Sequence, residues 1–263
     1  MTLDDLKIKI NWSKFYIGRD CTSYNDYINF DLTPEDFLEF AKEDYRTLDN
    51  RGLVGVLSNS KRAIDCQVDW IISYFGFDYL SFNEKNYPNI KEIINEFEKD
   101  ISYDTALSFK LRFIQTLEIA PTFLISKIRK FRNRLEHEYI VPKENEAREA
   151  IEIAELFINA TQNIMWHKFF SDYYISNEYD ENDSKLKIPH VRVGFDLHCS
   201  EKASINLYYN IDDENIGKII IKPEDKEYIF LVKSSISHNF SYLPKIFRCN
   251  IDYKFINYEI KEL

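Results

Sequence analysis

The segment ENEAREAIEIAELFINATQNIM, residues 144–165, decides most of the fold expected for this chain. Its apolar positions return at steps of three and four residues, which is the period of one face of an α-helix. The stripe consists of Ala147, Ala150, Ile151, Ala154, Phe157, Thr161, Ile164 and Met165. We therefore predict a long helix over residues 143–172 that contributes one side to the core of a helical bundle.

Five further helices are predicted between residues 34 and 140. The first begins at Thr33, whose hydroxyl can cap a helix, and at Pro34, which fits the first helical turn. The last lies between Pro121 and Pro142, because proline starts a helix easily and breaks one in its interior. The expected ranges are 34–48, 53–75, 89–100, 104–117 and 122–140.

The hydrophobic period changes to two at both ends of the chain, which is typical of half-buried strands. Strands are expected near residues 7–12 and 27–30, and then at 191–197, 205–209, 218–221, 228–233 and 247–259. Five acidic residues and no Lys or Arg lie between Ser171 and Ser184, which suits a solvated linker. The predicted fold class is α+β: a helical bundle with a C-terminal antiparallel β domain and short N-terminal strands. The expected domains are a β-rich segment (1–32), the bundle (33–175), an acidic linker (176–186) and the small β domain (187–263).

Composition excludes several classes of protein. Hydrophobic residues make up 44% of the chain and charged residues 30%, as in a soluble globular protein. The 6 glycines are too scattered for a Rossmann or Walker phosphate loop. The 4 cysteines form no CxxC or Cys/His cluster, no N-terminal signal peptide is evident, and no apolar run approaches the ~18 residues of a membrane span. We expect a cytoplasmic protein with no membrane association.

The stretch SKIRKFRNRLEHEY, residues 126–139, carries the chemistry. On a helical wheel, Leu124, Ile128, Phe131, Leu135 and Tyr139 define a buried face. Asn133 and His137 then point outward, with Lys130 on the same side. From residue 127 to 139 there are five cations and two acids, so this segment carries +3 within a chain of net charge −10. The cations are Lys127, Arg129, Lys130, Arg132 and Arg134.

Two interpretations of this segment stay open. A run of charge on a helix is often only a solvated face. Alternatively, the combination suits phosphate chemistry, because arginine forks onto phosphate oxygens and histidine exchanges a proton near neutral pH.

Residues Arg132 to His137 match the pattern R-x4-H, with a polar residue directly after the arginine. In this the chain resembles the HEPN superfamily of helical-bundle proteins, many of which are metal-independent RNases. Three other segments also resemble that family: the residues that follow the motif, Glu138–Pro142, the acidic helix through Glu155–Phe157, and the earlier segment Asn59–Asp65. The resemblance covers about residues 34–172 and neither β-rich end.

The resemblance implies a homodimeric endoribonuclease in which two motif helices form one composite site. His137 would assist attack by an RNA 2′-hydroxyl, Arg132 would stabilise the developing charge, and Asn133 would orient the pair. Lys127, Arg129, Lys130 and Arg134 would bind RNA phosphates, and no metal or cofactor would be needed. Relatives of this kind often act as toxins or phage-defence effectors, which implies an antitoxin or another regulatory protein as partner.

Other chemistries fit less well, and one non-catalytic role stays open. A second histidine is missing after His137-Glu138, so the HExxH metalloprotease motif is absent, and no GxSxG nucleophile motif exists. A metal-dependent nuclease built on Glu224-Asp225-Lys226 would rest on residues that are common in turns. The main alternative is a HEPN-type module that binds nucleotides or partner proteins without cleaving RNA.

Overall fold

The computed structural model describes residues 1–21, 30–98, 107–120, 130, 133–134, 137–179, 189–197, 203–212 and 214–262. The chain divides into two compact units. Unit 1 comprises Met1–Tyr24, Tyr87–Ile93 and Trp166–Leu263, and unit 2 comprises Asn25–Asn86 and Ile94–Met165. The chain therefore leaves unit 1 early and completes it only with its last hundred residues.

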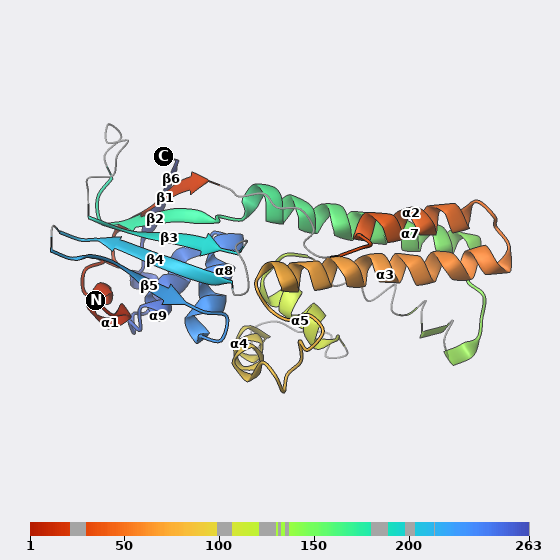
Figure 1. Cartoon of the computed structure of the whole chain (residues 1–263), viewed down its shortest axis with the longest axis horizontal. Helices are drawn as coiled ribbons and strands as arrows, with labels where there is room; N and C mark the ends of the chain where they lie inside the picture. Colours follow the sequence, from red (N-terminus) through yellow and green to blue (C-terminus); the bar gives the residue numbers. More distant parts are fainter. Residues whose placement is uncertain are drawn as a thin grey trace. The chain divides into compact units, whose positions relative to one another are not determined.

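The elements described within unit 2 are helices. They are α2 (Pro34–Tyr45), α3 (Asn50–Tyr74), α5 (Phe109–Thr116) and α7 (Glu144–Asn163). Helix α4 (Pro88–Glu98) contains the sequence position at which the two units are divided. Helices α2 and α7 both pack against α3 (Figure 1). The expected stripe of α7 is confirmed in its buried residues, and the buried Gln67 of α3 donates from Nε2 to the Thr161 hydroxyl at 2.9 Å.

Two local features fix the start of α2 and its approach to α3. Thr33 caps the helix as predicted, and the structure adds a capping box: the Thr33 hydroxyl accepts from the Asp36 amide, and the Asp36 carboxylate accepts from the Thr33 amide. At the start of α3, a Cβ on Gly52 would overlap the backbone carbonyl oxygen of Asp44 in α2. The absence of a side chain at Gly52 therefore permits the close approach of the two helices.

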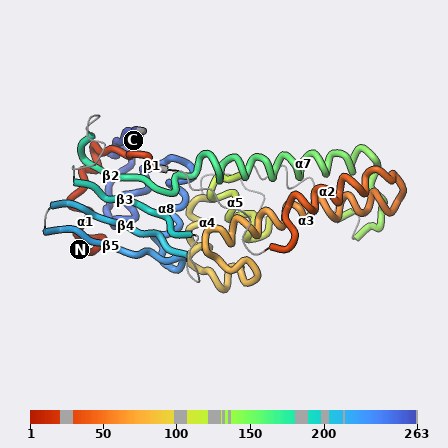
Figure 2. Tube along the Cα trace, turned by 45° about the horizontal axis from the view of Figure 1, so that its top comes forward, coloured from red at the N-terminus to blue at the C-terminus, as the bar shows by residue number. Residues whose placement is uncertain are grey.

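In its described residues, unit 1 is built around a six-stranded sheet of order β5-β4-β3-β2-β1-β6. The strands are β1 (Phe15–Cys21), β2 (Asp172–Ser176), β3 (His190–Asp196), β4 (Ser204–Asn210), β5 (Ile216–Ile221) and β6 (Tyr258–Glu262). Neighbouring strands are antiparallel except β1 and β6, which pair in parallel. The first and last strands of the chain thus lie side by side (Figure 2).

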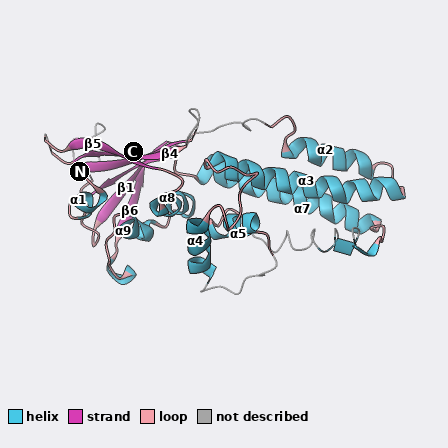
Figure 3. Cartoon of the chain, turned by 60° about the horizontal axis from the view of Figure 1, so that its bottom comes forward, coloured by secondary structure: helices cyan, strands magenta, loops and turns pink. Residues whose placement is uncertain are grey.

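Short helices accompany this sheet within unit 1. They are α1 (Leu3–Lys7), α8 (Lys226–Ser237) and α9 (Leu243–Ile246), with 3-10 turns at Phe240–Tyr242 and Tyr253–Phe255. A π-helix at Ile164–Lys168 spans the sequence position at which unit 2 ends and unit 1 resumes. Helices α8 and α9 lie on one face of the sheet (Figure 3). The strand side chains on that face form the core: Phe240 stacks against Tyr173 of β2 at 5.2 Å and against Tyr258 of β6 at 5.7 Å between ring centroids.

The predicted fold class is wrong. The sheet is large and mixed, whereas the sequence analysis expected a helical bundle carrying a small antiparallel C-terminal β domain and short N-terminal strands. Strands β1 and β2 are both interior strands of this sheet. The residues of β1 were expected in a short N-terminal segment, and those of β2 at the junction of helix and linker.

Several expected elements are also corrected. Residues 7–12 were expected to form a strand but contain the end of α1 and turns, and residues 228–233 lie in helix α8. Of residues 247–259, only the last two belong to a strand, since β6 begins at Tyr258. The sequence pattern did not indicate helix α8, because the residues from Tyr228 to Ile236 are buried. Without a solvated polar face, the helix lacks the 3.6-residue period by which it would be recognised. The expected strand at residues 27–30 falls mostly outside the described residues.

Candidate functional site

The described residues of the R-x4-H segment include two of its three predicted catalytic residues. Lys130, Asn133, Arg134 and His137 are helical, and all of them except the half-buried Arg134 are exposed. Asn133 and His137 are four residues apart, and on the helix predicted over residues 122–140 that spacing places them one turn apart on the same side. Arg132, Lys127 and Arg129 lie outside the described residues.

Arg134 is tied to the start of α7. Its Nη1 donates to Glu146 Oε1 at 2.7 Å, and Glu146 Oε2 accepts from the Lys143 amide at 2.9 Å. The hydrogen bond from the Lys143 amide, together with the Arg134 guanidinium, lowers the pKa of the Glu146 carboxyl below its ordinary value against the opposing effect of burial. An RNA phosphate would have to compete with Glu146 for Arg134, so this residue suits a structural tie better than the phosphate contact predicted for it.

The helix ends directly after Glu138, and this corrects the predicted buried face. Tyr139 has φ 57°, in the left-handed region, and its side chain is 85% exposed. The helical wheel fails at Tyr139 because the residue is no longer part of the helix. Ile140 and Val141, 44% and 37% exposed, extend an apolar run that begins two residues after His137.

A second cationic feature beside α7 was missed by the sequence analysis. Tyr45, Lys143, Glu144, Asn145 and Arg148 line an open hollow of about 350 Å³. The Tyr45 hydroxyl donates to Glu144 Oε1 at 3.3 Å, while Arg148 pairs with Glu152 at 3.6 Å. The Lys143 amide donates to Glu146, and Glu146 also accepts from Arg134. These two hydrogen bonds place the hollow next to the R-x4-H segment. In the sequence, the feature that could have indicated this hollow is Lys143, which lies between Pro142 and the start of α7.

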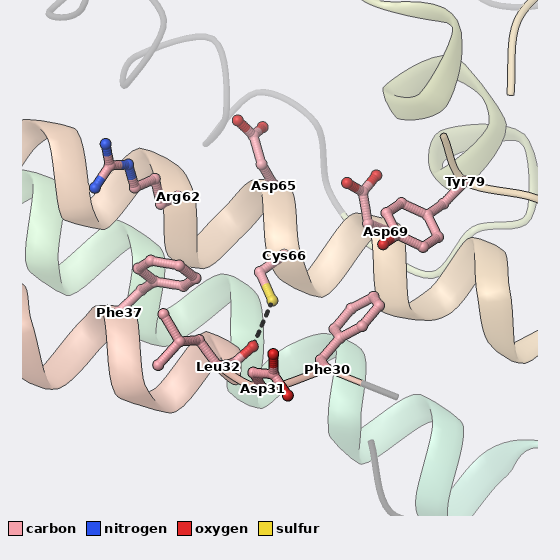
Figure 4. A pocket seen from close by; sticks show the side chains of 9 residues that line it. All are labelled: Phe30, Asp31, Leu32, Phe37, Arg62, Asp65, Cys66, Asp69 and Tyr79. Carbon is pink, nitrogen blue, oxygen red and sulfur yellow. Dashed lines mark hydrogen bonds between the residues drawn. The ribbon is translucent and has the colours of Figure 1, made fainter. Parts of the chain in front are cut away.

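A groove of about 530 Å³ runs along α3 in unit 2, and we call it the α3 groove (Figure 4). One wall comes from α3 and follows the spacing i, i+3, i+4 and i+7. The other wall is the segment that leads into α2, and rings from α2 and from the turn after α3 close the ends. The lining residues are Phe30, Asp31, Leu32, Phe37, Arg62, Asp65, Cys66, Asp69 and Tyr79.

Cys66 lies in the middle of the α3 groove and is a free, half-buried cysteine. Its thiol donates to the Leu32 carbonyl oxygen at 3.5 Å. Burial first, and then the carboxylates of Asp69, Glu35, Asp36 and Asp65, raise the pKa of the Cys66 thiol to about 12. The thiol is therefore protonated at neutral pH and is a poor nucleophile.

Asp69 marks the end of the groove beside Tyr79. Burial raises the pKa of its carboxyl, and Lys110 opposes this by donating from Nζ to Asp69 Oδ1 at 2.6 Å. The Lys110 ammonium also lies 5.7 Å from the centroid of the Tyr79 ring. One end of the groove thus already combines a carboxylate, an aromatic ring and an ammonium group.

Neither a metal site nor a membrane span is found in the parts of the chain that the structure describes. No group of three or more His, Cys, Asp or Glu residues there could hold a metal ion. None of the helices in those ranges combines the length and the apolar character that crossing a membrane requires.

Comparison with family models, with curated proteins and with solved structures found no match to this chain. The family suggested by the R-x4-H segment is therefore supported only by the residues of this sequence.

Proposed function

We propose that this chain is a metal-independent endoribonuclease of HEPN type that acts in the cytoplasm. The observation that carries the proposal is that Asn133 and His137, four residues apart within the R-x4-H sequence, are both helical and both exposed. A histidine held on a helix surface beside an amide and a cluster of cations has the proton-transfer and anion-binding groups that phosphate chemistry needs.

In the proposed reaction the ribose 2′-oxygen attacks the adjacent phosphorus and the bond from phosphorus to the 5′-oxygen breaks. His137 accepts the proton of the 2′-hydroxyl, and a proton returns to the departing 5′-oxygen. Arg132 stabilises the negative charge that grows on the phosphate oxygens, and Asn133 orients the two groups. The products are a 2′,3′-cyclic phosphate and a 5′-hydroxyl, and DNA is spared because it lacks the attacking hydroxyl.

The site needs a second copy of the chain. On a helix Arg132 and His137 are separated by five residues and about 140°, so they diverge too far to contact one phosphate easily. A second motif helix would close the site from the opposite side. The exposed apolar run of Tyr139, Ile140 and Val141, next to His137, offers a contact surface for that second copy.

The cleavage assay uses a labelled single-stranded RNA and the DNA of the same sequence, with EDTA present. Wild-type protein should cut the RNA and leave the DNA intact, and His137→Ala should reduce the rate by about 10²-fold or more, since it removes the general base. His167→Ala is the matched control, because His167 is also exposed and lies in unit 1. Intact RNA with wild type, or equal cutting by His137→Ala, would contradict the proposal.

Mixing two inactive variants tests the composite site. If one copy supplies Arg132 and the other His137, a dimer of Arg132→Ala with His137→Ala keeps one complete site. After exchange of subunits the mixture should recover about a quarter of wild-type activity, while each variant alone stays inactive. A mixture that remains inactive although mixed dimers are detected by mass spectrometry would rule out sharing of the site between subunits.

The proposed biological role is that of a toxin or phage-defence effector held in check by an antitoxin or another regulatory protein. Expression of wild type without its neighbouring genes should slow growth, and His137→Ala should relieve the effect. If the purified protein binds RNA or a nucleotide tightly and never cleaves it, the chain is instead a non-catalytic binding module.

A further inference from the structure

The α3 groove combines aromatic and acidic side chains around a concave surface. Three rings, those of Phe30, Phe37 and Tyr79, line it together with the carboxylates of Asp31, Asp65 and Asp69 (Figure 4). Phe30 and Tyr79 meet edge to face at 5.3 Å between centroids. Aromatic faces attract positive charge, and carboxylates strengthen that attraction where solvent is partly excluded.

The groove already holds an ammonium group of this chain at one end. Lys110 lies near the Tyr79 ring and bonds to Asp69, as described above. Asp65 is paired with Lys61 on the surface of α3. Asp31, on the opposite wall, makes no ion pair with the described residues, so its charge remains available to a ligand.

Four carboxylates act on the thiol at the centre of the groove. After burial, those of Asp69, Glu35, Asp36 and Asp65 raise the pKa of the Cys66 thiol, because a nearby negative charge disfavours the thiolate. Cys66 belongs to the α3 wall and its thiol bonds to the Leu32 carbonyl of the opposite wall, so a ligand bound beside the thiol would lie near the same carboxylates.

From this combination of rings, carboxylates and volume, we propose that the α3 groove binds a compact organic cation, an ammonium or guanidinium group carrying a short apolar substituent. The positive group lies between Asp31 and the acidic face of α3, and the apolar part packs on Phe30 and Phe37. Arg62, at the end opposite Tyr79, disfavours a second positive charge there (Figure 4). A monocation should therefore bind better than a linear diamine. This inference does not depend on the proposed RNase activity.

Calorimetric titration with benzyltrimethylammonium chloride tests the proposal. We expect saturable binding with one site per chain, and much weaker binding of benzyl alcohol, benzoate and 1,4-diaminobutane. Asp31→Asn should weaken the affinity by about fivefold or more, because it removes the unpaired carboxylate. Asp31→Glu, which keeps the charge, should retain most of the affinity. Asp252→Asn, in unit 1, is the matched control and should bind as wild type does.

A second readout places the ligand in the groove itself. At about pH 9.5, where part of the thiol begins to react, saturating benzyltrimethylammonium should slow the alkylation of Cys66 and leave that of Cys249 unchanged. The proposal is overturned if benzyl alcohol binds as tightly as the cation, if Asp31→Asn binds as wild type does, or if no saturable binding is seen up to about 10 mM.

Discussion

Cys66 is a residue at which burial and charge act in the same direction. Both disfavour the thiolate, so with a pKa of about 12 only about one thiol in ten thousand is ionised at about pH 8. Because the thiolate is the reactive form, we expect iodoacetamide to modify Cys66 far more slowly than an ordinary cysteine. The rate should continue to rise tenfold for each pH unit until about pH 11.

This prediction is checked by mass spectrometry of the Cys66 peptide after timed alkylation. Asp69→Asn removes the carboxylate with the largest effect on the thiol and leaves Lys110 without its partner, so it should speed the reaction at about pH 8 by about threefold or more. Glu152→Gln, on the exposed surface of α7, should leave the rate unchanged. A rate for Cys66 that levels off near pH 9 would show that the carboxylates do not govern this thiol.

At the scale of single residues, the sequence also indicated which groups of the candidate site are accessible. The outward positions of Lys130, Asn133 and His137 agree with their exposure, because helical periodicity alone determines them. The predicted burial of Tyr139 was wrong, because Pro142 marks the end of this helix only approximately and the helix already ends at Glu138. The partnership of Arg134 with Glu146 was equally hidden, because it joins residues of two different helical segments.

Among the helices, the approach of α2 to α3 depends on Gly52. In most helix interiors Gly→Ala stabilises by about 1 kcal/mol. Here Gly52→Ala should instead destabilise by about 1–2 kcal/mol, because the new methyl group would overlap the Asp44 carbonyl oxygen and push the helices apart. Urea unfolding followed by circular dichroism measures the change.

Gly55→Ala provides the comparison for this prediction. A Cβ at Gly55 would meet only the carboxylate of Asp44, which can rotate away at the cost of its hydrogen bond from Asn59 Nδ2 at 2.9 Å. The decrease in the free energy of unfolding should therefore be smaller than for Gly52→Ala. If Gly52→Ala unfolds at a higher urea concentration than wild type, the close approach of α2 and α3 does not depend on this glycine.

The elements that the sequence predicted well are those with one buried and one solvated face. Helix α7, the capped start of α2 and strands β3 and β4 all carry a clear period for this reason. Helix α8 is buried all round, so its period was lost. Strand β2 was assigned to the helix and linker because of the acidic residues around it. In the structure its single acid, Asp172, forms a two-pronged ion pair with Arg192 of β3 at 2.7 and 2.6 Å.

The α3 groove shows why a site assembled from separate segments escapes a motif search. Its α3 wall does leave a trace in the sequence, since Arg62, Asp65, Cys66 and Asp69 form a polar stripe at helical spacing. The opposite wall, Phe30–Leu32, becomes part of the site only when the chain turns into α2. The fold had to be known before these residues could be grouped.

At the scale of the whole molecule, the sheet of unit 1 joins both ends of the chain. Strand β6 pairs with β1, the Phe15 amide donates to the Asn257 carbonyl at 3.2 Å, and the Phe15 and Tyr258 rings pack at 5.6 Å. Deleting residues 257–263 removes all of these contacts. We expect amide hydrogen exchange in Phe15–Cys21 to accelerate by about tenfold or more, since β1 then becomes an unprotected edge.

Exchange measured by mass spectrometry on separate peptides resolves this prediction. Peptides from α3 lie in unit 2 and should keep their wild-type exchange rates, and deletion of Leu263 alone should have no effect on β1. Unchanged protection of β1 in the longer deletion would mean that β2 and the core on its own hold the strand in place.

Because unit 1 is built from segments at both ends of the chain, its strands cannot all pair at the same stage of synthesis. Strand β1 leaves the ribosome early, but its antiparallel neighbour β2 begins only at Asp172 and its parallel neighbour β6 at Tyr258. All of unit 2 is synthesised between β1 and β2, so its helices can pack before β1 has a neighbouring strand. Phe15 and Ile17 of β1 are buried in the complete structure, and during that interval the strands that flank β1 do not yet exist. A nascent chain that stalls before its last few residues therefore leaves one side of β1 open to pairing with other chains.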